Sequence, residues 1–321
     1  MNKFKWKKKG LIFNPKSRYD WMNTHAQVPY SLIIGNDILR VFFSTREKQD
    51  INGNFKSYSA YVDLDINNFE NIINVSANPI IKLGCVGEFD EFGSMAGSIC
   101  KHEDEYWLYY CGWQRSLSTP YNWAIGLAKS IDDGKSFRKI GPGPIVGPTI
   151  NEPYLQACPI VHKFPDSTCW HMFYLSGVKW IDVQHNKKES QYLIMHATSN
   201  DGISWERNSK PIIQPLVDDE CQTSSTIFYK DGFYHMFFSY RHGVDFRNNI
   251  GRSYRIGYAY SDDLINWKRD DSLAGIDVSE VGWDSEMIAY PHIFINAGRF
   301  FMLYCGNDFG ENGFGYAVLE N

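Results

Sequence analysis

Short apolar runs alternate with polar turns along the whole chain, and this pattern is typical of β-strands. In the clearest example, the apolar run at residues 226–229 is followed by Lys230, Asp231 and Gly232 and then by the aromatic run at residues 233–240. A short turn with glycine between two runs of β-branched and aromatic residues indicates a β-hairpin. Acidic residues at positions 218–220 lie just before the first strand of this hairpin.

The aromatic strand of this hairpin recurs about five times along the chain. The copies lie at residues 39–46, 106–113, 169–177, 233–241 and 299–307, and their starts are roughly 60 to 67 residues apart. A third strand follows most copies, at residues 124–130, 192–199, 255–261 and 314–321, and a fourth is expected at residues 144–146 and 211–213. Four antiparallel strands per repeat and five repeats predict an all-β fold, a five-bladed β-propeller.

The N-terminal residues complete this pattern. Residues 6–15 match residues 205–215, which include the fourth strand of a blade, whereas the last copy stops after its third strand at Asn321. We therefore expect the N-terminal strand to become the outer strand of the last blade, which would close the ring without an unpaired edge. Residues 1–321 are predicted to form one domain.

Composition narrows the classes of function. The net charge is −5 and the signs are scattered, which argues against nucleic acid as a partner. The chain shows neither an apolar stretch of about 18 residues nor a signal peptide, so we expect no membrane partner and a cytoplasmic location. The seven cysteines lack the spacing of metal ligands, which fits free thiols in a reducing compartment. No metal or cofactor is predicted.

Acidic residues gather where the predicted inner strands begin. When the repeats are aligned on these strands, four of the five carry a carboxylate at the same position, and two carry a second one nearby. In a propeller these entries meet on one face around the axis. The candidate catalytic residues are Asp90, Glu152, Glu220, Asp284 and Glu286. A structural interpretation stays open, because acidic residues also begin turns and strands for solvation.

Basic, aromatic and polar residues are expected on the same face. The candidate substrate-binding residues are His25, Gln27, Arg46, Trp113, Arg115, Arg241, Arg255 and Tyr290. Aromatic rings can stack on sugar faces, and arginines can hold an anionic group with two parallel hydrogen bonds. The alternative is that the arginines neutralise the neighbouring carboxylates.

Three motifs at these entries resemble the five-bladed propeller enzymes of the arabinanase, levansucrase, invertase and mannoside-phosphorylase group. Glu220-Cys221 resembles the Glu-Cys pair that holds the acid of invertase-type enzymes. Glu152, in Asn-Glu-Pro, resembles the acid position of arabinanase-type enzymes, and Asp90, in GEFDEFGS, resembles the second-blade aspartate of the group. The sequence departs from the group in the first blade, where NTHAQVP replaces the segment with the aspartate and Asp20 lies a few residues too early.

The resemblance implies a carbohydrate-active enzyme that cleaves or transfers a glycosidic bond. One protonated carboxyl, with Glu220 and Glu286 as first candidates, would act as general acid, and a second carboxylate as base or nucleophile. If the arginines hold phosphate, the reaction would be phosphorolysis. Two alternatives stay open: a non-catalytic glycan-binding propeller, which the missing first-blade acid favours, and a transferase of a surface-polysaccharide pathway.

Overall fold

The computed structural model describes residues 2–165, 167–183 and 187–320, so Met1 and Asn321, the ends of the predicted domain, lie outside the described residues. The strands are β1 (Trp6–Phe13), β2 (Thr24–Ile34), β3 (Ile38–Arg46), β4 (Ser57–Asp65), β5 (Asn68–Val75), β6 (Gly93–His102), β7 (Glu105–Gln114), β8 (Asn122–Ser130), β9 (Arg138–Lys139), β10 (Gln156–His162), β11 (Trp170–Asp182), β12 (Lys188–Ser199), β13 (Glu206–Arg207), β14 (Cys221–Lys230), β15 (Phe233–Arg241), β16 (Arg255–Ser261), β17 (Lys268–Arg269), β18 (Ala289–Asn296), β19 (Arg299–Cys305) and β20 (Phe314–Leu319). The short helical turns are η2 (Ile250–Arg252), η3 (Asp271–Leu273) and α1 (Asn307–Gly310). The all-β prediction is confirmed. In the part of the chain that the structure describes, no helix has the length and apolar character needed to cross a membrane.

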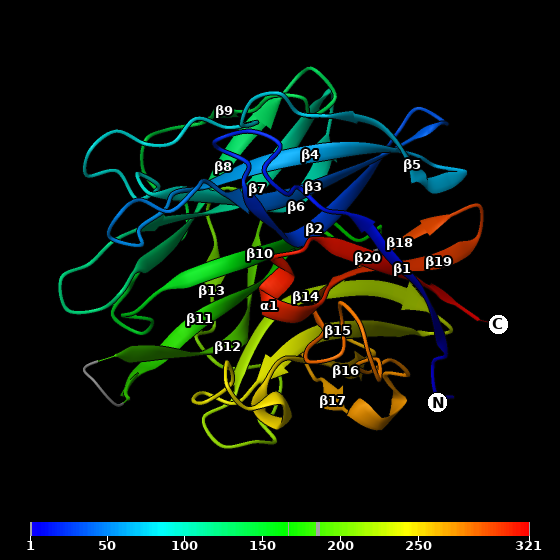
Figure 1. Ribbon diagram of the computed structural model, residues 1–321. Coiled ribbons are helices and arrows are strands. Elements are labelled where there is room, and N and C mark those ends of the chain that lie inside the picture. Colours follow the sequence, from blue (N-terminus) through cyan, green and yellow to red (C-terminus); the bar gives the residue numbers. More distant parts are fainter. Residues whose placement is uncertain (1, 166, 184–186, 321) are drawn as a thin grey trace.

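The strands form antiparallel sheets that follow one another in chain order (Figure 1). Three sheets have four strands each, in the orders β10-β11-β12-β13, β14-β15-β16-β17 and β18-β19-β20-β1. Strands β2 to β9 are joined between β4 and β6 by a single parallel pair, Ser57 and Gly93. We therefore refer to β2–β5, β6–β9, β10–β13, β14–β17 and β18–β20 with β1 as units 1 to 5. Strand β1 pairs with β20, where the sequence match places the N-terminal strand.

The first strand of every unit carries a bulge at an equivalent place. Strands β2, β6, β10, β14 and β18 each shift register against the next strand near their beginning. Four of these bulges contain a residue with positive φ, namely Val28, Cys158, Ser224 and Tyr290. Positive φ is costly for a β-branched residue such as Val28, and a bulge bends the strand and re-aims its side chains. The repeats thus share a local geometry at the end where the candidate site residues gather.

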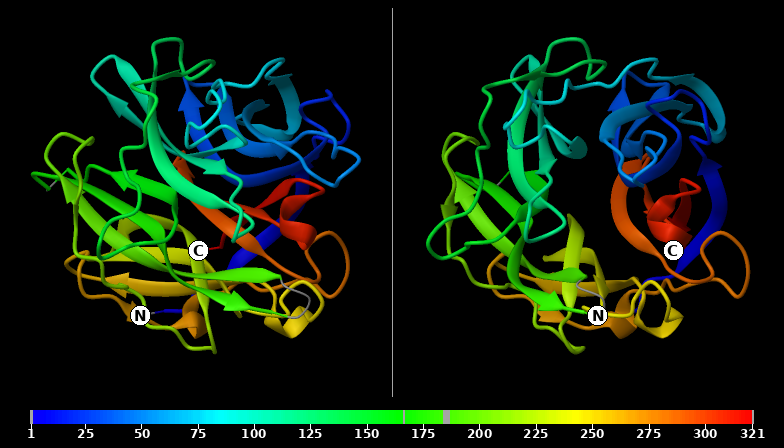
Figure 2. Two further views of the ribbon diagram at one scale, coloured as in Figure 1. Left: turned by 90° about the vertical axis from the view of Figure 1, so that its left-hand side faces the viewer. Right: turned by 60° about the vertical axis from the view of Figure 1, so that its left-hand side comes forward.

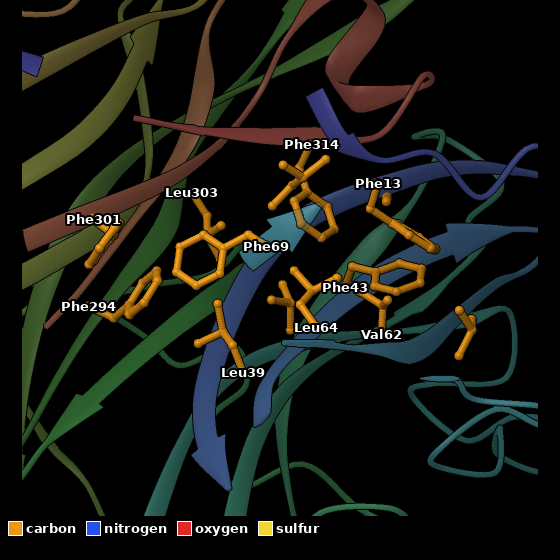
Figure 3. Packing of buried hydrophobic residues seen from close by; sticks show 14 of the residues in the cluster. Phe13, Leu39, Phe43, Val62, Leu64, Phe69, Phe294, Phe301, Leu303 and Phe314 are labelled. Atoms are coloured by element: carbon orange, nitrogen blue, oxygen red, sulfur yellow. The ribbon is translucent and has the colours of Figure 1, made fainter. Parts of the chain in front are cut away.

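The core consists of clusters between neighbouring units. Four clusters join each unit to the next one along the chain. A further cluster joins unit 5 back to unit 1, where Phe13, Leu303 and Phe314 pack against Phe43 and Val62 (Figure 3). Figure 2 shows the units following one another around a common centre. Each fully buried leucine, valine or phenylalanine side chain contributes about 1.5–3 kcal/mol to the stability of the fold. The clusters therefore fix the orientation of every unit against its neighbours.

The fourth strands begin earlier than the sequence pattern indicated. In units 2, 3 and 4 they are the two-residue strands β9, β13 and β17, which directly follow the aromatic residue of the turn, whereas units 1 and 5 have the eight-residue strands β5 and β1. The predicted segment 144–146 makes only an isolated bridge, between Val146 and Ile125. The segment is hydrogen-bonded to β8 at Ile125, whose N–H donates to the Val146 carbonyl at 2.8 Å. In units 2, 3 and 4 the outermost strand is therefore formed by the residues just after the aromatic position.

Candidate functional site

Two of the predicted catalytic aspartates lie in matching buried ion pairs. Asp90 is completely buried and accepts a hydrogen bond from Lys139 of β9, with 2.5 Å between Nζ and Oδ2. Asp284 is 3% exposed and accepts from Lys8 of β1, with 2.7 Å between the same atoms. In each case a tyrosine hydroxyl donates to the same Oδ2 at 3.0 Å. Each aspartate is thus neutralised by the outermost strand of its own unit.

Glu152 of unit 3 has equivalent surroundings. Its exposed fraction is 2%, and the Tyr174 hydroxyl lies 2.9 and 3.0 Å from the two carboxylate oxygens. Ser209 donates to Oε1 at 2.8 Å, and Arg207 of β13 lies 3.4 Å from Oε2. The cation again comes from the outermost strand.

Glu220 of unit 4, the predicted general acid, is the most completely bonded of the set. Arg269 of β17 donates to Oε1 at 2.6 Å, and the side-chain amide of Gln222 donates to the same oxygen at 2.7 Å. The backbone N–H groups of Leu216 and Val217 donate to Oε2 at 2.9 and 3.2 Å. The carboxylate is completely buried, so four donors and a positive charge surround it and no face is open to a substrate.

These contacts bear on the roles expected for Asp90, Glu152, Glu220 and Asp284, which stay predictions. No hydrogen bond or ion pair joins any two of them within residues 2–165, 167–183 and 187–320; each is bound inside its own unit. Burying a carboxylate is costly unless a cation and hydrogen bonds compensate for the lost water, which explains why each has a basic partner. The contacts favour the structural alternative, in which the four side chains anchor the fold.

The basic partners follow a motif that the sequence contains but that the prediction of the site did not use. Each comes two residues after an aromatic residue that precedes or begins the outer strand. The four copies are Trp6-Lys7-Lys8, Phe137-Arg138-Lys139, Trp205-Glu206-Arg207 and Trp267-Lys268-Arg269. Unit 1 has Phe69-Glu70-Asn71 instead, and it also lacks the acidic residue. The acid and the cation are therefore present together in four units and absent together in the fifth.

Glu286 differs from the other four carboxylates because its residue is exposed. Its backbone N–H donates to Asn307 at 2.8 Å, and its carbonyl accepts from Arg255 at 3.0 Å. Arg255 also lies 3.3 Å from Asp277, which is not one of the candidate carboxylates. Glu286 is the one predicted catalytic residue that a substrate could reach.

A pocket of about 340 Å³ lies where units 1 and 2 meet at the entry of their inner strands. Four of the predicted substrate-binding residues line it: Gln27 of β2, Arg46 at the end of β3, Trp113 of β7 and Arg115 just after it. The remaining lining residues are Gly53, Asn54, Phe55, Ser57, Met95, Pro120, Tyr121 and Trp123. The loops that follow the second strands of both units thus form one wall of the pocket.

Arg46 and Arg115 face this pocket without a carboxylate partner. Arg46 donates to Gln27 at 3.2 Å and stacks over the ring of Phe55 at 4.6 Å. Arg115 donates to the carbonyl of Phe55 at 3.3 Å and stacks over Phe92. Neither arginine takes part in an ion pair within the described residues, and the pocket lining contains no acidic residue. Burial lowers the pKa of Arg46 to about 10, which leaves it charged at neutral pH.

Aromatic rings form the other walls. Tyr121 and Trp123 stack with 4.4 Å between ring centroids and 9° between planes. The Trp113 indole N–H donates to Ser57 at 2.6 Å, which fixes the ring at the pocket wall. Flat, fixed rings of this kind offer an apolar face to a sugar ring. The pocket therefore combines stacking surfaces with two cations that have no acidic partner among the described residues.

The other predicted binding residues lie outside this lining. Burial and the charge of Arg46 lower the pKa of His25 to about 3, so its imidazole is neutral at neutral pH. Arg241 is 3% exposed and stacks at 3.5 Å over Phe246. Tyr290 occupies the bulge of β18, where its N–H donates to a serine at 2.7 Å. In the described residues, no group of histidine, cysteine and acidic side chains could hold a metal ion.

The whole chain was compared with known protein families, sequences and structures. No family model matches the chain. Two Mycobacterium tuberculosis proteins described as uncharacterized, Rv1502 (strain H37Rv) and MT1551 (strain CDC 1551), are each 35% identical over 317 residues, which cover 98% of this chain and 99% of each relative.

Solved structures with the same fold are glycoside hydrolases and related proteins. One glycoside hydrolase has a TM-score of 0.76 at 16% identity and covers 100% of this chain and 93% of its own. An exo-1,5-alpha-L-arabinanase from a bovine ruminal metagenomic library has a TM-score of 0.63 at 12% identity, covering 95% of both chains. A thermostable family-43 glycoside hydrolase has a TM-score of 0.61 at 16% identity, covering 92% of this chain and 88% of its own. The resemblance to propeller glycosidases that the sequence suggested is confirmed at the level of fold.

Proposed function

Because the chain belongs to the family of the M. tuberculosis proteins Rv1502 and MT1551 and has the fold of the propeller glycosidases, we propose that it is a carbohydrate-active enzyme of glycosidase type. Its substrate would carry an anionic group and bind in the pocket between units 1 and 2. Fold alone does not fix an activity. The proposal therefore depends on the chemistry of the pocket.

We infer further that the five units are the five blades of a closed propeller. Three observations support this interpretation: the bulge at the same place in each first strand, the packing cluster between units 5 and 1, and the pairing of β1 with β20. In such a ring the entries of all inner strands share one face, so the pocket lies beside the axis on that face.

The observation that carries the proposal is the pair of arginines without a carboxylate partner in a pocket with aromatic walls. Arg46 is half-buried and forms no ion pair within the described residues, so an anionic ligand would offset part of the cost of burying its guanidinium. Arg46 and Arg115 can each donate two parallel hydrogen bonds to a carboxylate, phosphate or sulfate group. Tyr121, Trp113 and Trp123 would hold the sugar ring that carries it. A uronic acid or a phosphorylated sugar satisfies both requirements.

Catalysis would require a carboxyl group that reaches this ligand. Glu311, which follows α1, is exposed, and its charge raises the pKa of Arg46, so it lies within electrostatic range of the pocket. Its backbone carbonyl also accepts a hydrogen bond from the backbone N–H of His25 at 3.1 Å. We therefore propose Glu311 and Glu286 as the acid–base candidates, in place of the buried Glu220. Phosphorolysis stays a prediction, with Arg46 and Arg115 as the phosphate ligands.

A non-catalytic glycan-binding protein is the second candidate. The specific observation in its favour is that the pocket lining contains no acidic residue. Glycosidases of the usual kind place two carboxyl groups on either side of the scissile bond.

The test is calorimetric titration with trigalacturonate, and maltotriose serves as the neutral control. We expect binding of the acidic sugar only, with Arg115→Ala weakening it by about 1.5–3 kcal/mol, as for charge-assisted hydrogen bonds. The matched control is Arg138→Ala, an exposed arginine far along the same unit, which should bind as wild type. Equal affinity of Arg115→Ala and wild type would refute the anionic pocket.

Activity separates the two candidate functions. Release of reducing ends from acidic oligosaccharides, measured with and without inorganic phosphate, should occur with wild type and fall by about 100-fold in Glu311→Gln if this residue supplies the proton. Binding without any turnover would favour the glycan-binding protein.

A further inference from the structure

A second concave region lies at the edge of the molecule opposite the pocket. Inner strands begin at the pocket edge, so the turn after β14 and the turn before β19 lie at the other end. Two cavities open there, of about 920 and 690 Å³. Both are lined by Lys230, Leu319 and Glu320, so we refer to them together as the trough; its lining includes residues of β1 and the end of β20, two strands that lie side by side in Figure 1.

The trough is strongly basic in a protein of net charge −5. Its basic lining residues are Lys3, Lys5, Lys7, Lys9, Lys230 and Arg299, and its acidic ones are Asp231 and Glu320. Within the described residues, ion pairs use only two of the six cations: Lys7 with Glu320 and Lys230 with Asp231. The other four face the trough without an acidic partner.

The lysines form a row because of the period of an extended chain. Phe4 and Trp6 turn toward the core, where Trp6 is 8% exposed, while the odd-numbered lysines turn outward. Alternate residues of a strand are about 6.6 Å apart on one face, so four lysines from position 3 to position 9 span about 20 Å. A ligand that matches this row must carry several negative charges along a line.

Protection of an exposed edge does not account for all of this charge. Strand β1 is the edge of its sheet, and lysines on an edge strand prevent pairing with other chains. Lys230 and Arg299, however, come from the end of β14 and from the start of β19. Their convergence on the same cavities as the β1 lysines requires a different reason.

We propose that this trough binds a linear acidic polysaccharide, as a second site remote from the pocket. The trough is concave, which suits a chain better than a flat lipid surface. Phe233, 37% exposed, and Tyr260 line it and offer ring faces to sugars, while the lysines pair with successive carboxylates. The choice of an acidic glycan over other polyanions rests on the proposed function. One part of the polymer would then bind in the trough, while another part of the same polymer, or its end, would bind in the pocket.

The experiment compares a polymer with a fragment. The probes are fluorescent polygalacturonate, which is long enough for the trough, and trigalacturonate, which fits the pocket. The triple variant Lys5→Gln/Lys9→Gln/Lys230→Gln should bind the polymer about ten-fold more weakly and with a shallower salt dependence, yet bind the trimer as wild type. The matched control Lys101→Gln/Lys135→Gln/Lys210→Gln, three exposed lysines elsewhere, should bind both probes as wild type.

Two outcomes would overturn the proposal. One is unchanged polymer affinity in the trough variant; the other is tighter binding of oligo-dT or of phosphatidylglycerol vesicles than of polygalacturonate, with the same loss in the variant. Arg115→Ala separates this proposal from the pocket, because it should lose trimer binding and keep the lysine-dependent part of polymer binding. Equal melting temperatures of variant and control exclude an effect of unfolding.

Discussion

Glutamine at position 220 tests whether the buried carboxylate supports the fold or the chemistry. The substitution keeps the shape of the side chain and removes its negative charge. Glu220 accepts four hydrogen bonds, two on each oxygen: Arg269 and Gln222 on Oε1, and two backbone N–H groups on Oε2. A glutamine has one oxygen and one NH₂ group, so it cannot accept at both positions.

The expected cost follows from this count. In either amide orientation, two buried donors lose their acceptor and face another donor. Each unsatisfied buried donor costs about 1–3 kcal/mol, and removing one partner of a buried ion pair costs about 3–5 kcal/mol. Arg269 keeps a second acid, Asp271, at 2.8 Å, which limits the loss. We expect the free energy of unfolding to fall by about 3–5 kcal/mol, within a total of about 5–15 kcal/mol, so the variant still folds.

Urea unfolding at constant m-value measures this change. The control is Glu286→Gln, which alters an exposed carboxylate and should change the free energy of unfolding by less than about 0.5 kcal/mol. Turnover per folded molecule of Glu220→Gln should stay close to wild type. A variant with wild-type stability and a 100-fold loss of turnover would refute this reasoning and restore Glu220 as the general acid.

Two further predictions concern the anchors and the buried histidines. Lys8→Met leaves the Asp284 carboxylate buried without its cation and should lower the free energy of unfolding by roughly 3 kcal/mol, measured by urea unfolding; a change below 1 kcal/mol would contradict the assigned role of β1. Burial, followed by the charge of His162, lowers the pKa of His292 from 6.5 to about 3, so the unfolded chain binds the proton first as the pH falls. The contribution of neutral His292 to the free energy of unfolding is fully present above about pH 6.5 and declines toward pH 3, with a loss of about 2 kcal/mol at pH 5. The variant His292→Gln should therefore show a smaller fall of melting temperature between pH 7 and pH 5 than wild type.

The fold could be predicted because its signals are local. Each hairpin is encoded by alternating apolar residues and a glycine turn within about 25 residues, and the repetition supplies the number and order of strands. The outer strands were placed less well. The apolar segment 211–213 was predicted as the outer strand of unit 3. The outer strand of that unit is formed by Glu206 and Arg207 instead, and a strand of two residues has no periodicity that a sequence could show.

The site was harder to predict, because a sequence shows where an acid occurs but not whether water reaches it. Asp90 and Glu152 align with the entries of inner strands, where catalytic acids would also stand. Their role depends on a cation about 50 residues later, Lys139 or Arg207, whose partner is visible only in three dimensions. Arg46 and Arg115 line one pocket, and their binding role stays a prediction. Arg46 and Arg241 end the second strands of units 1 and 4, whereas Arg115 lies just past that of unit 2, so no need common to all five units accounts for them.

This contrast explains why the pocket forms beside unit 1. Units 2 to 5 share a buried acid and a cation that tie the inner-strand entry to the outer strand. Unit 1 lacks both, and its own buried pair, Arg40 with Asp63, lies elsewhere, with Arg40 donating at 2.8 Å to the Asp133 carbonyl of unit 2. The entry of unit 1 is therefore released from the anchor, and Gln27 and Arg46 occupy it instead. Restoring the anchor there, rather than removing it elsewhere, is the change that should abolish ligand binding while leaving the propeller intact.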